Sequence, residues 1–122
     1  MESRIGYLNV GVRELERSIA FYRDLLGFKL IYSEPGFHYA AFEVGGLKFA
    51  IAASEIDGFT GQPTGNRHTG IGLVVEDVDA AHTELTAKGV SFPMPPARQP
   101  WGGYMGVFAD PDGNLFYLDG AA

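Results

Sequence analysis

The sequence predicts an α+β fold made of two tandem βαβββ modules, and three observations carry this prediction. Apolar residues alternate with polar or small ones over several short segments, which is typical of half-buried strands. Two longer segments repeat apolar residues at helical spacing and then reach a glycine. The pattern of residues 12–16 also returns 63 residues later, at residues 75–79, which indicates an internal duplication.

The first module is predicted over residues 5–53. Residues 5–12 alternate with a period of two and therefore predict a strand. An apolar stripe at helical spacing follows, and Gly27 stands where a glycine commonly ends a helix. Three further strands are predicted at residues 28–32, 37–44 and 47–53, the last two joined by a Gly-Gly turn.

Residues 54–69 show no periodicity and hold several glycines, so they are predicted to form a linker. The second module is predicted over residues 70–119. Its helix is expected to be capped by Asp77 and to end at Gly89. The predicted strands are residues 70–75, 90–94, 104–108 and 115–118, with an Asp-Pro-Asp-Gly-Asn turn before the last.

The composition excludes several classes of protein. The chain has 122 residues, of which 46% are hydrophobic and 20% charged, as in a soluble globular domain. There is no cysteine, so disulfides, thiolate nucleophiles and cysteine-held metals are excluded. A net charge of −6 disfavours binding to nucleic acid. No apolar run is long enough to span a membrane or form a signal peptide, so we expect a cytoplasmic protein.

Two phrases make the chain similar to the vicinal oxygen chelate superfamily, which includes glyoxalase I, extradiol dioxygenases, fosfomycin-resistance enzymes and bleomycin-binding resistance proteins. Residues 14–28 read ELERSIAFYRDLLGF and closely resemble the family's helix signature. Residues 108–115 read FADPDGNL and contain its hairpin motif. The resemblance implies that residues 1–122 form one domain, in which the two modules curl into a half-open cup lined by the faces opposite the helices.

The resemblance also implies where a metal would lie. Metal-dependent members hold the ion with His, Gln or Glu at four cup positions, which carry over to Tyr7, Ala50, Gly70 and Tyr117. Alanine and glycine have no side-chain donor, and neutral phenols are poor ligands. We therefore expect no metal, no cofactor and no catalytic residues. A register shift of two residues would bring His68 into the set; otherwise it is expected to be a solvated linker histidine.

Strand alternation is expected to direct six side chains to the face that lines the cup. These are the candidate ligand contacts: Tyr7, Asn9, Tyr39, Trp101, Met105 and Tyr117. Such a wall suits a flat, partly apolar organic molecule, through stacking and oriented hydrogen bonds. Small residues on the same face, such as Ala41, Ala50 and Gly72, favour space for a ligand. The alternative is that the rings fill the cup themselves.

These observations predict a homodimer that sequesters a small organic ligand or antibiotic, as the resemblance to the bleomycin-resistance branch implies. The alternative is a glyoxalase- or dioxygenase-like lyase or isomerase acting on a small metabolite. A third class, a structural or regulatory dimer, would have a filled cup. Metal content and ligand binding separate the three.

Overall fold

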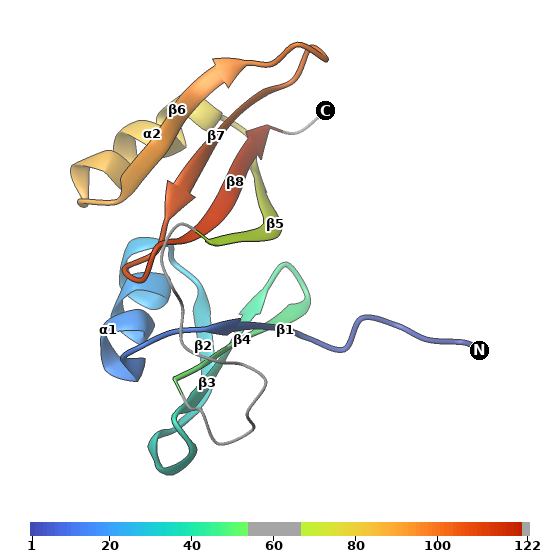
Figure 1. Cartoon of the computed structure of the whole chain (residues 1–122), viewed down its shortest axis with the longest axis vertical. Helices are drawn as coiled ribbons and strands as arrows, with labels where there is room; N and C mark the ends of the chain where they lie inside the picture. Colours follow the sequence, from blue (N-terminus) through green and yellow to red (C-terminus); the bar gives the residue numbers. More distant parts are fainter. Residues whose placement is uncertain (54–66, 121–122) are drawn as a thin grey trace. The chain divides into compact units, whose positions relative to one another are not determined.

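The computed structural model describes residues 1–53 and 67–120 (Figure 1). The chain divides into two compact units, residues 1–63 and 64–122. Each unit has one four-stranded sheet and follows the order strand, helix, strand, strand, strand. This confirms the predicted α+β class and the repeated βαβββ order. Residues 54–66 of the predicted linker lie outside the described residues.

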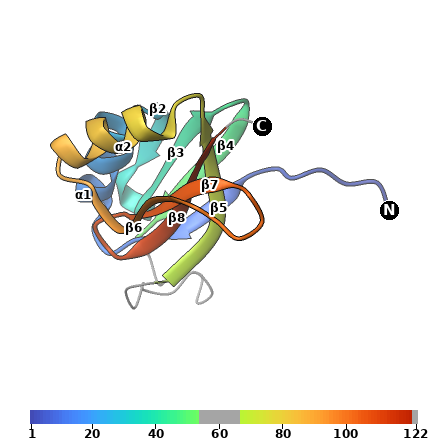
Figure 2. The same cartoon turned by 90° about the horizontal axis from the view of Figure 1, so that it is seen from above.

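The first unit contains a mixed sheet with the strand order β1-β4-β3-β2. Its elements are β1 (Leu8–Gly11), α1 (Leu15–Ala20), β2 (Lys29–Glu34), β3 (Tyr39–Val44) and β4 (Leu47–Ala52). β1 is parallel to β4, and the other pairs are antiparallel. The segment before β1 extends away from the sheet in both views (Figures 1 and 2). Gly45 and Gly46 both have positive φ, as a tight hairpin turn between β3 and β4 requires.

Helix α1 continues into a π-helical turn, Phe21–Leu25, and Gly27 ends the segment with φ +78°. Tyr22 of this turn is fully buried and lies against strand side chains. Its ring centroid is 5.1 Å from that of Phe49 and 6.0 Å from that of Phe42. The helix therefore covers the sheet face that carries these phenylalanines, and the core of the unit lies there.

The second unit repeats this arrangement with the strand order β5-β8-β7-β6. Its elements are β5 (Arg67–Val75), α2 (Val78–Ala87), β6 (Ser91–Arg98), β7 (Tyr104–Ala109) and β8 (Asn114–Gly120). The predicted cap is confirmed, because Asp77 Oδ1 accepts a hydrogen bond of 3.0 Å from the Ala80 N–H. Stacked Phe108 and Phe116, with centroids 5.3 Å apart, mark the face that α2 covers.

Polar side chains stabilise the turn between β7 and β8. Buried Asp110 accepts hydrogen bonds from the backbone N–H groups of Asp112 and Asn114, at 2.9 and 2.8 Å. The Asn114 amide donates to the second Asp110 oxygen, and its own oxygen accepts from Arg67. The Asp-Pro-Asp-Gly-Asn motif is therefore a hydrogen-bonded turn.

Two boundaries in the second unit differ from the prediction. β5 begins at Arg67, so residues 67–69 belong to a strand and not to the linker. The register shifts between His68 and Gly72, where Gly70 has φ +76°. This bulge interrupts the alternation of side chains along β5, so the first residues of the strand were not predicted. β6 runs to Arg98 through prolines that suggested a loop. They are tolerated because β6 is an edge strand.

No helix in the described part of the chain is both long and apolar enough to cross a bilayer.

Candidate functional site

Each sheet has one face that its helix does not cover, which we call the helix-free face. In the first sheet, the register places Asn9 beside Ala50 and Ala50 beside Ala41, on the side opposite the phenylalanine core. In the second sheet, Tyr117 lies between Gly72 and Val107 on the corresponding side. All the candidate residues of the predicted cup except Trp101 occupy these two faces.

A cluster of three tyrosines and a lysine lies on the helix-free face of the first sheet; we call it the tyrosine–lysine cluster. Lys48 Nζ lies 5.7 Å from the ring centroid of Tyr7 and 5.8 Å from that of Tyr39. The Tyr39 ring in turn lies 5.8 Å from the Tyr32 ring. Tyr7 and Tyr32 are exposed, whereas Tyr39 and Lys48 are half-buried. The cluster is therefore an aromatic surface with one positive charge in it.

The side chains of Tyr39 and Lys48 lean toward each other along the sheet. Tyr39 is paired with Ala52 and Lys48 with Glu43, so the Ala41–Ala50 pair separates them along the ladder. The 5.8 Å between Lys48 Nζ and the Tyr39 ring shows that these side chains approach each other across this pair. Ala41 and Ala50 are fully buried. Two of the small residues that were expected to leave space are therefore covered, whereas Gly72 is exposed.

Tyr117 and His68 form the corresponding pair on the second sheet. Their ring centroids are 4.2 Å apart, with an interplanar angle of 43°. The strand bulge brings them together, because it pairs His68 with Leu115 and Gly72 with Tyr117. The interpretation of His68 as a linker residue is therefore wrong, although the residue is exposed as predicted. Between His68 and Gly72, the pairing of β5 with β8 shifts by two residues.

A backbone hydrogen bond determines the tautomer of neutral His68. The Gly70 N–H donates to His68 Nδ1 at 2.9 Å, so Nδ1 carries the lone pair. The ring proton then resides on Nε2, which is a hydrogen-bond donor. Binding of a metal through Nε2 would require the proton to move to Nδ1 and would break this bond.

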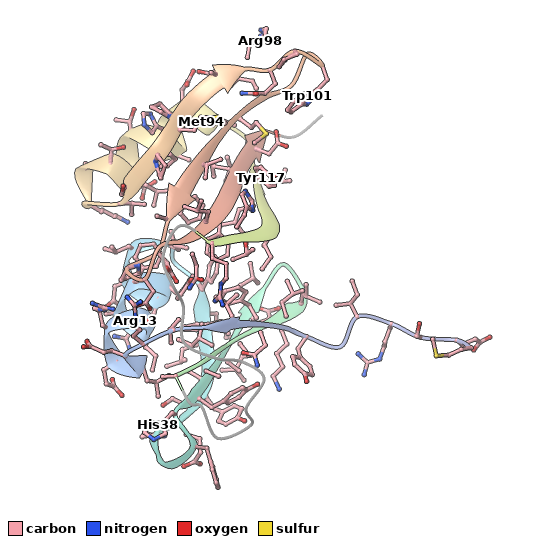
Figure 3. The ribbon with its side chains drawn as sticks, in the orientation of Figure 1. Arg13, His38, Met94, Arg98, Trp101 and Tyr117 are labelled. Carbon is pink, nitrogen blue, oxygen red and sulfur yellow. The ribbon has the colours of Figure 1, made fainter. Side chains whose placement is uncertain are left out.

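Trp101 and Met105 differ in exposure. Trp101 is 72% exposed in the turn between β6 and β7, at the tip of the hairpin (Figure 3). A Cβ atom on Gly103 would lie 2.8 Å from Trp101 Nε1, so the indole folds back over that glycine. Met105 is buried, and it pairs with Asp119 on the helix-free face. Met105 thus belongs to the wall, whereas Trp101 is free to contact a ligand.

Tyr104, the neighbour of Met105, has the opposite orientation. Its hydroxyl donates to Asp79 Oδ1 of helix α2 at 2.5 Å. This hydrogen bond raises the pKa of Tyr104 above its ordinary value, because the neutral phenol is the form that donates. Tyr104 therefore ties β7 to α2 and takes no part in the helix-free face.

Five of the six candidate contacts form two sets, one on each sheet, and Trp101 lies in the turn between β6 and β7. Tyr7, Asn9 and Tyr39 share the first helix-free face, and Met105 and Tyr117 share the second. Sequence reasoning missed Lys48 and Tyr32. Lys48 carried a detectable signal, since it stands two residues before Ala50 and so has the same strand parity. Tyr32 carried none, because a register shift between Leu30 and Tyr32 breaks the alternation of β2.

The residues of the helix-free faces do not fit a metal ion. Within residues 1–53 and 67–120, no group of three or more His, Asp or Glu side chains lies close enough to hold one. Ala50 and Gly70 offer no side-chain donor. His68 presents a proton and not a lone pair at Nε2, for the reason given above.

A family profile and a solved structure identify the same superfamily. The family profile described as Glyoxalase/Bleomycin resistance protein/Dioxygenase superfamily matches residues 4–118. The uncharacterized protein YraH of Bacillus subtilis (strain 168) is 31% identical over 115 residues, which cover 88% of this chain and 90% of that protein. A superfamily member from Sphaerobacter thermophilus DSM 20745 is 30% identical, with a TM-score of 0.84 and 99% of each chain covered. TnmS3, an antibiotic-binding protein from Streptomyces sp. CB03234, is 26% identical, with a TM-score of 0.79 and coverages of 99% and 98%.

Proposed function

Because the chain belongs to the glyoxalase/bleomycin resistance protein/dioxygenase superfamily, we propose that it is a binding protein for a flat, partly apolar organic molecule. It holds this molecule without altering it, and it works without a metal or cofactor. Each helix-free face offers its own ligand contacts. On the first sheet they are Tyr7, Asn9 and Tyr39, joined by Lys48 and Tyr32; on the second they are Met105 and Tyr117, joined by His68.

The tyrosine–lysine cluster is the observation that carries this proposal. Its rings stand on the face that no helix covers, and Tyr7 and Tyr32 are 58% and 47% exposed. Exposed rings of this kind stack on planar molecules. The likeness to an antibiotic-binding protein supports sequestration as the mode of action.

In this proposal, the absence of a metal follows from the side chains that are available as ligands. Metal-dependent chemistry needs several ligands that present lone pairs. Ala50 and Gly70 present none, and His68 Nδ1 is already bonded to the Gly70 N–H. No reaction step through an ion is therefore part of the proposed function.

The alternative is a lyase or isomerase, and the His68–Tyr117 pair is the observation that favours it. His68 Nε2–H and the Tyr117 hydroxyl are both proton donors, and their rings are 4.2 Å apart. An enzyme of this kind would release a molecule with a changed structure. A binding protein releases the molecule that it bound.

A screen of planar aromatic compounds by two-dimensional NMR of the protein tests the proposal. Hits are expected to shift the backbone amides of Ala41 and Ala50, below the cluster. In Tyr39→Ala they should bind several-fold more weakly, because a stacking partner is lost. Phe37→Ala is the matched control, since Phe37 is 70% exposed just before β3 and outside the cluster. Hits that bind both variants and the parent protein equally would contradict the proposal.

A further inference from the structure

We propose that the ligand of this site carries an anionic group, and that Lys48 receives it. The inference rests on the proposed function and adds the chemical class of the ligand: a planar aromatic molecule with a carboxylate, sulfonate or acidic hydroxyl. Three features of Lys48 support the inference: its partial burial, the position of its ammonium relative to carboxylates, and the two rings beside it.

Lys48 is half-buried and its charge is directed to rings, not to carboxylates. Its cross-strand partner is Glu43, the closest acidic residue by register. Yet among the described residues no carboxylate lies within ion-pair distance of Lys48 Nζ. The ammonium instead stands between Tyr7 and Tyr39, and the face of an aromatic ring attracts a cation more weakly than a carboxylate does.

The two rings beside the ammonium define the shape of the molecule it would receive. Nζ is nearly equidistant from the centroids of Tyr7 and Tyr39, at 5.7 and 5.8 Å. An anionic oxygen at Nζ would form a charge-assisted hydrogen bond. The arene attached to it would then lie against one of the phenol rings.

A cationic ligand is disfavoured at the same place. It would have to displace the Lys48 ammonium from the rings or accept repulsion from it. The net charge of −6 attracts cations to the protein as a whole. Lys48 therefore gives the cluster a positive charge, whereas the net charge of the molecule is negative.

Lys29 provides a matched control for the charge. It lies on the same sheet, in edge strand β2, and pairs with Glu43 from the other side. It is exposed, and within residues 1–53 and 67–120 no ring–cation contact includes it. Lys29→Met and Lys48→Met remove the same charge from the same sheet face, but only Lys48→Met removes it from the tyrosine–lysine cluster.

Three probes of one shape test the proposal: 2-naphthoate, neutral 2-naphthamide and cationic 2-naphthylmethylammonium. Their binding is followed through the backbone amides of Ala41 and Ala50 by NMR titration. We expect 2-naphthoate to bind at least about tenfold more tightly than 2-naphthamide, a difference of about 1.4 kcal/mol. Lys48→Met should abolish this preference, and Lys29→Met and Lys48→Arg should retain it.

Several results would overturn the proposal. Equal binding of naphthoate and naphthamide would contradict the anionic group while leaving binding of planar molecules intact. The same holds for tighter binding of the cation, or for an equal loss of preference in Lys29→Met. Failure of all three probes to shift the cluster amides would contradict both this inference and the proposed function.

Discussion

The hydrogen bond from the Gly70 N–H to His68 Nδ1 determines what this histidine can offer a ligand. It leaves Nε2 as a proton donor beside the Tyr117 ring. This backbone contact is one of the observations on which the proposal of a metal-free site rests. It arises from the bulge in β5, where only a residue tolerant of positive φ, here Gly70, fits readily.

Asp110 is the residue whose removal should destabilise the second unit most clearly. In Asp110→Ala, two buried backbone N–H groups and the Asn114 amide lose their acceptor. Each buried group left unsatisfied costs about 1–3 kcal/mol, so we expect the free energy of unfolding to fall by about 3 kcal/mol or more. Urea denaturation measures it.

Asp24→Ala is the control for this change. Asp24 forms an exposed ion pair with its neighbour Arg23, and such pairs contribute little to stability because water screens the charges. An Asp110→Ala protein as stable as Asp24→Ala would show that the turn does not depend on these bonds.

Trp101 should matter for binding and hardly at all for stability. Its side chain is 72% exposed, so Trp101→Ala should change the free energy of unfolding by about 0.5 kcal/mol or less. Loss of a stacking ring should weaken several-fold the binding of a planar molecule that shifts backbone amides of the second unit. Titration of the variant with such a molecule measures this. A large loss of stability, or unchanged binding, would place Trp101 outside the site.

At the scale of elements, the sequence was sufficient wherever alternation was regular and a glycine ended the element. Helix α2, its Asp77 cap and the glycine turn between β3 and β4 were all predictable for that reason. Prediction failed where backbone irregularity broke the period. The bulge at Gly70 shortened the predicted β5, and the prolines of β6 imitated a loop although an edge strand accepts them. The same irregularity explains why the His68–Tyr117 pair was not predicted, since the bulge in β5 brings these two side chains together.

The close approach of β6 to β7 depends on Gly106. A Cβ atom there would lie 2.9 Å from the Met94 carbonyl oxygen and 3.0 Å from Pro96 N, and neither backbone atom can move freely. Gly106→Ala should therefore lower the free energy of unfolding by about 1–3 kcal/mol. Thermal denaturation of the variant checks this.

Gly72→Ala is the matched control in the same sheet. A Cβ at Gly72 would meet only the Tyr117 Cβ at 3.6 Å, an ordinary contact. This variant should be as stable as the parent, or more stable by about 0.4–1 kcal/mol, because the unfolded chain loses freedom. Equal destabilisation by both substitutions would contradict the packing described for β6 and β7.

At the scale of the whole molecule, two βαβββ units follow one another, each with a helix on one sheet face and aromatic side chains on the other. The duplication was predictable from repeated sequence motifs, because each module needs the same helix ending and the same hairpin. The ligand was not predictable, since the chemistry lies in side chains such as Lys48 whose neighbours come from other strands. The class of ligand that we propose could be inferred only once the register between the strands was known.

We expect the protein to be a homodimer in solution. Each unit is small and its helix covers only one face of its sheet, and pairing with a further copy would bury more apolar surface. Multi-angle light scattering at micromolar concentration should give twice the chain mass of 13.2 kDa. A mass near that of a single chain would contradict this prediction.

Native mass spectrometry of the purified protein tests the central claim, binding of an unaltered planar organic molecule without a metal, most directly. After incubation with a hit from the aromatic screen, we predict an adduct of the mass of that compound and no mass increment for a transition metal. On denaturation the compound should be recovered unchanged, and Tyr39→Ala should reduce the adduct while Phe37→Ala retains it. A tightly held metal ion, or recovery of the compound as a converted product, would contradict the account and favour an enzyme.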